Sequence, residues 1–157
     1  MNRLLVVDDQ KIIREGVRCL LSGRPDLQVV ADAETGKAAI EKAFDDGLNI
    51  DMVLMDIRMP EMDGIEVSRR ILAEKPKTKI IMLSVFGDRY WVERSLKSGA
   101  RGFVLKGCSK HELLSAINRV ARGNIYLSPA IEGEIVADYI HRLRQRQPQP
   151  TPRRQSN

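Results

Sequence analysis

Five short apolar segments recur along this chain at intervals of 22 to 28 residues, and this spacing is its most constraining feature. The segments cover residues 3–8, 27–33, 51–56, 79–85 and 101–105, and each interval between them holds an amphipathic stretch with helical periodicity. Strands that alternate with helices form right-handed crossovers and a parallel sheet. The apolar runs 4–7, 53–55 and 80–83 lack polar alternation, as strands do when helices cover both faces. We therefore expect a doubly wound, five-stranded α/β domain.

Two of the expected helices carry clear start signals. Asp63 with Glu66, and Ser109 with Glu112, have the spacing of a capping box. In that motif the side chains satisfy backbone N–H groups that the first helical turn leaves without partners. We therefore expect helices to begin directly after Asp63 and Ser109.

The composition changes beyond residue 124. Ile131, Ile135 and Tyr139 lie at helical spacing after a Ser-Pro pair, so we expect a further helix with one apolar stripe. That stripe must dock on the domain, pair with a second chain or await another domain. The predicted organisation is a domain over residues 1–124, a linker or accessory helix over 125–147 and a disordered tail over 148–157.

The net charge of +5 belongs to the end of the chain. Residues 142–157 contain five arginines and no acid, and removing those arginines leaves 21 basic against 21 acidic residues. The folded domain is therefore formally neutral, and the basic character of the whole chain is poor evidence for nucleic-acid binding.

Several features favour a cytoplasmic protein that does not contact a membrane. No apolar run approaches the roughly 18 residues that a membrane span needs. The acidic pair Asp8 and Asp9 comes too early for a secretory signal. The two cysteines, Cys19 and Cys108, form neither a metal motif nor a disulfide framework, which suits a reducing compartment.

Polar residues stand where the expected strands end. Asp8 and Asp9 follow the first strand, and the ends of the third, fourth and fifth carry Asp56, Ser84 and Lys106 respectively. Parallel sheets bind ligands at this edge, so we expect these groups to converge if the strand order places the first, third, fourth and fifth strands side by side. Crowded carboxylates repel one another unless they share a cation, and oxygen ligands favour Mg²⁺. Such a site can transfer a phosphoryl group to a carboxylate.

With these residues in place, the chain resembles the receiver domain of two-component response regulators. The resemblance covers residues 3–123 and is specific as a set. It is carried by residues 4–9 (LLVVDD), residues 56–64 (DIRMPEMDG), Ser84 and residues 102–106 (GFVLK). It implies a flavodoxin-like, CheY-like fold with strand order 2-1-3-4-5.

The resemblance also assigns roles around the acidic residues. Asp56 would be the phosphoacceptor. Asp9 and Asp56 would bind Mg²⁺ directly, together with the backbone carbonyl of Arg58, while Asp8 would act through a water molecule. The chain is then a signalling switch rather than an enzyme, assisting only its own phosphoryl transfer and dephosphorylation.

Three further residues take roles from the same resemblance. Lys106 would contact the phosphoryl group, Ser84 would be the switch hydroxyl and Phe103 the switch aromatic residue. Many receivers have a tyrosine at the position of Phe103, so this ring has no hydroxyl to bond outward.

Residues 123–129 (GNIYLSP) resemble the end of receivers in the NarL/FixJ (LuxR-type) subfamily. That implies phosphorylation by a sensor histidine kinase, homodimer formation on phosphorylation, and control of transcription through a helix-turn-helix DNA-binding domain. We expect that domain to be absent from this chain, as in a truncated form. A stand-alone receiver that acts only through protein contacts is the alternative, and a metal-dependent phosphatase of related topology is a weaker one.

Overall fold

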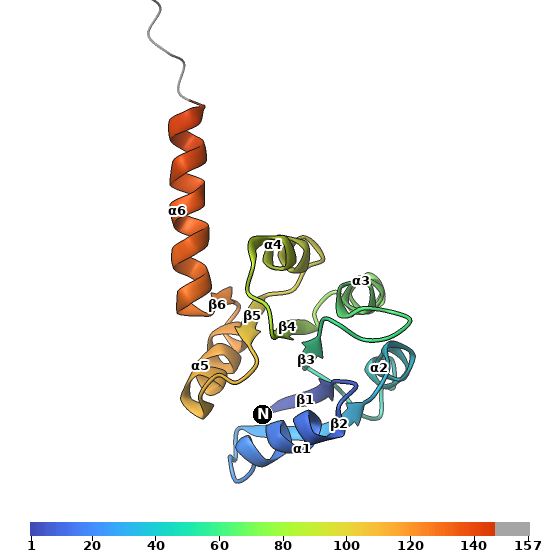
Figure 1. The fold of residues 1–157 in the computed structure, drawn as a ribbon. Helices are drawn as coiled ribbons and strands as arrows, with labels where there is room; N and C mark the ends of the chain where they lie inside the picture. Colours follow the sequence, from blue (N-terminus) through green and yellow to red (C-terminus); the bar gives the residue numbers. More distant parts are fainter. Residues whose placement is uncertain (147–157) are drawn as a thin grey trace, which may run out of the picture.

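The computed structural model describes residues 1–146 and has the predicted α/β architecture. Its centre is one parallel sheet in the order β2-β1-β3-β4-β5-β6 (Figure 1). The expected five-stranded order is confirmed, and a sixth strand extends it at the β5 edge. The tail predicted over residues 148–157 lies outside the described residues.

The strands are short, and those in the centre of the sheet are largely buried. They are β1 (Asn2–Val7), β2 (Leu27–Ala33), β3 (Met52–Asp56), β4 (Lys79–Ser84), β5 (Gly102–Leu105) and β6 (Tyr126–Leu127). Successive side chains of β1 enter opposite cores: Leu5 packs into the cluster on one face of the sheet and Leu4 into the cluster on the other. Both faces are therefore apolar, which explains why the strand sequences lack polar alternation.

Helices cover the sheet on both sides. They are α1 (Lys11–Leu20), α2 (Gly36–Ala43), α3 (Gly64–Glu74), α4 (Arg89–Lys97), α5 (Lys110–Ala121) and α6 (Pro129–Gln145). Helices α1 and α5 pack on one face, while α2, α3 and α4 pack on the other (Figure 1). Within residues 1–146, none of the helices combines the length and apolar character that a membrane crossing requires.

The predicted helix starts and their N-caps are confirmed at both helices, although no bond from the Glu66 or Glu112 side chain back to the cap completes the capping box. The Asp63 side chain accepts a hydrogen bond from the Glu66 N–H at 2.9 Å, at the start of α3. The Ser109 hydroxyl accepts one from the Glu112 N–H at 3.1 Å, at the start of α5. These bonds place both helix starts directly after the strand-end loops that carry the polar residues.

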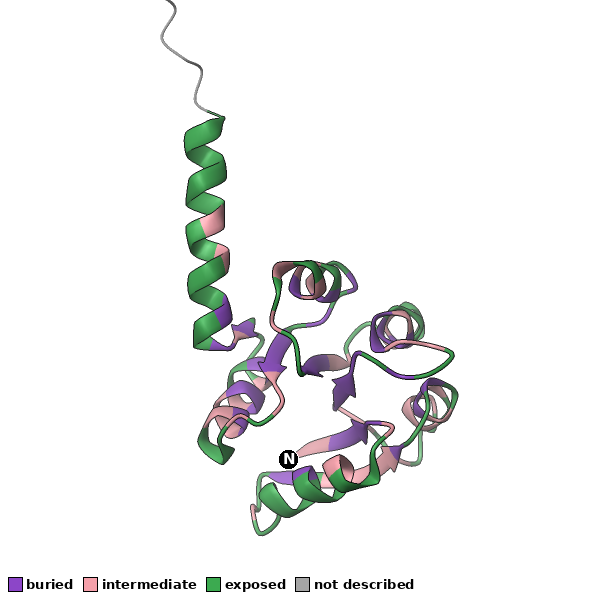
Figure 2. Cartoon of the chain, in the orientation of Figure 1, coloured by how far each residue is buried: buried purple, intermediate pink, exposed green. Residues whose placement is uncertain are grey.

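The sheet extends beyond the boundary predicted at Asn124. Strand β6 pairs in parallel with β5, and its Tyr126 is buried. Ile131, in the first turn of α6, is also buried in the core, whereas Tyr139 is 61% exposed. The predicted stripe therefore docks only at its beginning, and most of α6 stands clear of the domain as an exposed helix (Figure 2). A two-residue strand has no periodicity, so the sequence pattern did not indicate β6.

Candidate functional site

The residues predicted at the strand ends meet at one edge of the sheet. Strands β1, β3, β4 and β5 are consecutive neighbours, so their carboxyl ends lie side by side. Asp8 follows β1, Asp56 ends β3, Ser84 ends β4 and Lys106 follows β5. This edge borders a cavity of about 450 Å³ whose lining includes Asp56, Ser84 and Lys106. The parallel topology therefore creates the cluster.

Lys106 bridges the two buried carboxylates. Its Nζ lies 2.8 Å from Asp8 Oδ2 and 3.0 Å from Asp56 Oδ1. Asp8 is 1% exposed and Asp56 is 4% exposed. The backbone N–H of Gln10 also donates to Asp8 Oδ1 at 2.8 Å. Asp8 is thus held from two directions, and Asp56 is held by a cation that can also reach an incoming anion.

The electrostatics of the site keep Asp56 reactive near neutral pH. Burial raises the pKa of the Asp56 carboxyl from 3.8 to about 6; the hydrogen bond from Lys106 opposes this, and the negative charges of Asp8 and Asp9 add to it. Burial disfavours the charged form of Lys106, but its hydrogen bonds to Asp8 and Asp56 outweigh that and raise the pKa of its ammonium group. At neutral pH Asp56 is therefore an ionised carboxylate in a poorly solvated place.

The three carboxylates are close enough to share a cation. Asp8, Asp9 and Asp56 each offer an oxygen, and these oxygens all lie within 4.8 Å of one another. Asp9 is more open to solvent than the other two and lines the same cavity as Asp56. Carboxylate oxygens at the edge of an open cavity suit Mg²⁺, because this ion prefers oxygen ligands and keeps several of its water molecules. The residues present therefore fit this ion.

Ser84 and Phe103, the two residues predicted to act as a switch, are both buried in neighbouring strands. Ser84 is buried, and its Oγ accepts a hydrogen bond from the Phe86 N–H at 3.1 Å. The Ser84 carbonyl accepts a bond from the Lys106 N–H at 2.7 Å, which joins the ends of β4 and β5. Phe103 is fully buried in β5, so its ring lies inward in this structure.

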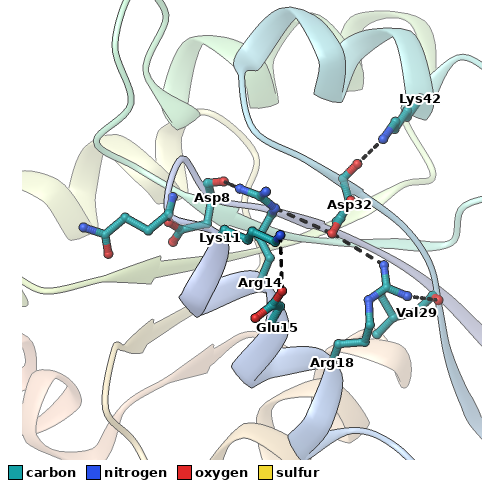
Figure 3. A network of polar contacts seen from close by, with 9 residues as sticks. Asp8, Lys11, Arg14, Glu15, Arg18, Val29, Asp32 and Lys42 are labelled. Carbon is teal, nitrogen blue, oxygen red and sulfur yellow. Dashed lines mark hydrogen bonds and ion pairs between the residues drawn. The ribbon is translucent and has the colours of Figure 1, made fainter.

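A charged network behind Asp8 was not found from the sequence. Arg14 Nη1 donates to the Asp8 carbonyl at 2.7 Å, and Arg14 Nε lies 3.6 Å from Asp32 Oδ2 in β2 (Figure 3). Arg18 reaches the same Asp32 oxygen at 3.6 Å. Arg14 and Arg18 are four residues apart on α1, but that spacing alone does not indicate a partner on β2. The network fixes the backbone of Asp8 from behind.

Gly64 lies against the backbone of Asp56. A Cβ atom at Gly64 would lie 2.1 Å from the Asp56 carbonyl oxygen and 2.9 Å from Met55 Cγ. The Gly64 N–H donates to the Ile57 carbonyl at 2.7 Å. The loop after β3 therefore folds back on the strand end, which holds Asp56 in place and requires glycine there.

Arg58 forms part of the roof over the cavity. Its guanidinium carbon lies 5.0 Å from the centre of the Phe86 ring and 5.5 Å from that of Trp91. Both distances suit cation–π contacts. Arg58 and Phe86 also line the cavity with Asp56, so their side chains limit access to it.

Comparisons with known proteins agree with this geometry. A family model, the response regulator receiver domain, matches residues 4–118. The transcriptional regulatory protein DegU of Brevibacillus brevis is 35% identical over 137 residues, which cover 87% of this chain and 57% of DegU. A two-component response regulator of the LuxR family from Aurantimonas sp. SI85-9A1 has 31% identity and a TM-score of 0.82, covering 88% of this chain and 97% of that structure.

A second similar structure is the CheX-CheY-BeF3-Mg+2 complex from Borrelia burgdorferi. It has 28% identity and a TM-score of 0.71, and the match covers 76% of this chain and 88% of that chain. This chain spans only 57% of the length of DegU, so DegU extends well beyond the matched region.

Proposed function

This chain belongs to the response regulator receiver domain family, and from that premise we propose that it accepts a phosphoryl group on Asp56 and signals through the resulting change of state. The observation that carries the proposal is the buried Asp56 carboxylate beside Lys106 at 3.0 Å, with two further carboxylates within 4.8 Å. A metal-dependent phosphatase, the weaker alternative, would not account for Ser84, Phe103 and Lys106 together.

The transfer uses the groups already in place. An oxygen of the Asp56 carboxylate attacks the phosphorus, the bond from phosphorus to a histidine nitrogen of the donor kinase breaks, and its electron pair leaves with that nitrogen. Lys106 then donates to a phosphoryl oxygen. Asp9, Asp56 and the backbone carbonyl of Arg58 would hold Mg²⁺, and Asp8 would act through water. When bound, the ion supplies positive charge that screens the acids from the phosphoryl group.

The same reaction sets a switch. The Ser84 hydroxyl can donate its proton to a phosphoryl oxygen while it still accepts from Phe86. The new hydrogen bond draws Ser84, at the end of β4, toward the phosphoryl group. That shift favours the inward position of the Phe103 ring, which is already fully buried here. Phosphorylation thus shifts an existing equilibrium and alters the surface of α4, β5 and α5. Ser84→Ala should be phosphorylated yet lose much of this response in hydrogen exchange.

The proposed output follows the relatives, such as DegU, that are named as transcriptional regulators. We propose that a phosphorylated receiver of this kind forms a homodimer and controls a helix-turn-helix domain that binds DNA. A sensor histidine kinase in the cytoplasm supplies the phosphoryl group. The free thiols of Cys19 and Cys108 are compatible with a reducing compartment. The alternative output, a receiver that acts only through protein contacts, predicts a phosphorylation-dependent complex without DNA.

The experiment that tests this function uses acetyl phosphate as the donor, with and without Mg²⁺. The wild-type chain should gain one phosphoryl group that is stable in acid and labile in base. Asp56→Asn should gain none. Asp9→Asn should bind Mg²⁺ weakly and react slowly while keeping its fold. Asp46→Asn is the control, because Asp46 is exposed and pairs with Lys75 instead. Labelling of Asp56→Asn at the wild-type rate would show the proposal to be wrong.

A further inference from the structure

Helix α6 is attached to the domain by one side of its first half. Ile131 is 3% exposed, and a Cβ on Gly87 would lie 3.0 Å from its Cγ1, so the two residues are in close contact. Asp138, two turns further along, forms an ion pair with Arg89 of α4. These contacts fix which side of α6 faces the domain.

A second apolar stripe lies on another side of α6. Val136 is 50% exposed, Tyr139 61%, Ile140 44% and Leu143 47%. They are spaced at i, i+3, i+4 and i+7, so they form one continuous face of the helix. Nothing within residues 1–146 covers that face, and α6 extends away from the sheet (Figure 1). A contiguous apolar face on a projecting helix is typical of an interaction surface.

Charges divide α6 into two halves of opposite sign. Glu132, Glu134 and Asp138 lie in the first ten residues of α6, which include no basic residue. Arg142 and Arg144 lie in the rest of the helix and Arg146 is its C-cap, and this part has no acidic residue. The pattern matches the dipole of a single helix. It also makes the helix complementary to an antiparallel copy of itself, whereas two parallel copies would place like charges together.

We propose that α6 pairs antiparallel with α6 of a second copy of this chain through the stripe of Val136, Tyr139, Ile140 and Leu143. A two-fold axis beside Tyr139 and Ile140 places Val136 of one copy opposite Leu143 of the other. It also brings Glu132 of one copy near Arg146 of the other. Each copy thus uses the same surface patch, as a two-fold contact requires.

This pairing is a separate contact from the homodimer proposed to form on phosphorylation, because it does not depend on Asp56. The Arg89–Asp138 ion pair holds α6 with its other side against the domain, so the stripe stays available to another molecule. The helix is about 25 Å long and the stripe covers about two of its turns. That contact is smaller than a standard interface, so the dimer is weak and concentration-dependent.

Sedimentation equilibrium on the full chain tests the proposal, over concentrations from about 10 µM to about 1 mM. The wild-type chain should shift from monomer to dimer, and Asp56→Asn should do so equally. Leu143→Ser should raise the dissociation constant at least about tenfold. Ala137→Ser, which makes the same kind of change on the exposed part of α6 outside the stripe, should leave it unchanged. Circular dichroism should show the same helix content in both variants.

Charge reversal tests the orientation. Glu132→Arg and Arg146→Glu should each weaken the dimer several-fold, and the double variant should restore it, because an antiparallel pair brings these positions together across the interface. A chain that is monomeric up to about 1 mM overturns the proposal and leaves the stripe to a different protein. A dimer that Leu143→Ser does not weaken, or that the double variant does not restore, overturns it as well.

Discussion

The strand-end site and helix α6 depart from the usual distribution of side chains in opposite ways. At the site, charged groups are buried: Asp8 is 1% exposed and Asp56 4%. On α6, four apolar side chains are exposed. The buried charges have a partner within the chain, Lys106, which holds Asp8 and Asp56 together before any ligand arrives. The apolar face has no such partner in residues 1–146, so only another molecule could cover it.

The largest expected effect on the free energy of unfolding comes from adding one methyl group in each of the two regions. Gly64→Ala should lower the free energy of unfolding by about 4 kcal/mol, because the new Cβ would lie 2.1 Å from the Asp56 carbonyl oxygen. Gly133→Ala in α6 meets no atom within 4 Å, so it should stabilise the helix by up to about 1 kcal/mol. Urea denaturation of both variants measures the difference. Equal effects of the two substitutions would contradict it.

The next largest effect is the difference in unfolding free energy between removing a buried ion pair and removing a more exposed one. Lys106→Met should cost about 3 kcal/mol of unfolding free energy at neutral pH, because Asp8 and Asp56 lose their shared cation. Arg89→Met, which removes the ion pair with Asp138 on α6, should cost about 0.5 kcal/mol. Both variants are compared by urea denaturation without divalent cations. A cost for Lys106→Met as small as that for Arg89→Met would mean that the site is not preorganised by this lysine.

A pH dependence follows from the pKa of Asp56, which burial raises from 3.8 to about 6. Between these values the folded chain keeps a proton that the unfolded chain releases, so the contribution of Asp56 to stability falls as pH rises from about 4 to about 6. Asp56→Asn removes this loss. Without divalent cations the variant should match the wild type near pH 4 and exceed it by about 2 kcal/mol above pH 6. A difference that does not change with pH would argue against a buried, strained carboxylate.

The smallest expected effect concerns the roof of the cavity. Arg58 and Phe86 stack at 5.0 Å over the acceptor, where they hinder an attacking water molecule. Replacing both with serine should speed loss of the phosphoryl group about threefold to tenfold. Arg94→Ser is the matched control, because Arg94 stacks on Tyr90 at 5.1 Å elsewhere on α4. If the double variant loses its phosphoryl group at the wild-type rate, Arg58 and Phe86 do not limit the access of water to it.

Much of the fold was predictable from the sequence because both cores are built from local patterns. Apolar runs marked five strands, and the caps at Asp63 and Ser109 marked two helix starts that the structure confirms. The clustering of Asp56, Ser84 and Lys106 followed from a parallel sheet together with the strand order that the family resemblance implied, and the structure has that order. Their chemical roles stay predictions.

Contacts between distant segments account for what the sequence missed. The close approach of Gly64 to Asp56, and the stacking of Arg58 on Phe86, depend on how a loop folds back on the sheet. On α6, the pattern predicted one stripe through Ile131 and Tyr139. In the structure Ile131 is buried and Ile135 packs against the core, whereas Tyr139 is exposed, because α6 extends away from the sheet beyond its first turns (Figure 1).

The most direct measurement of the central claim maps the position of the phosphoryl group. Three aspartates, Asp8, Asp9 and Asp56, offer oxygens within 4.8 Å of one another, so each is a chemical candidate. The chain is phosphorylated with acetyl phosphate and Mg²⁺, the acyl phosphate is reduced with borohydride to homoserine, and the peptides are sequenced by mass spectrometry. Phosphorylation of Asp56 should give homoserine at position 56 alone. Homoserine at position 8 or 9, or no conversion at position 56 in a phosphorylated chain, would contradict it.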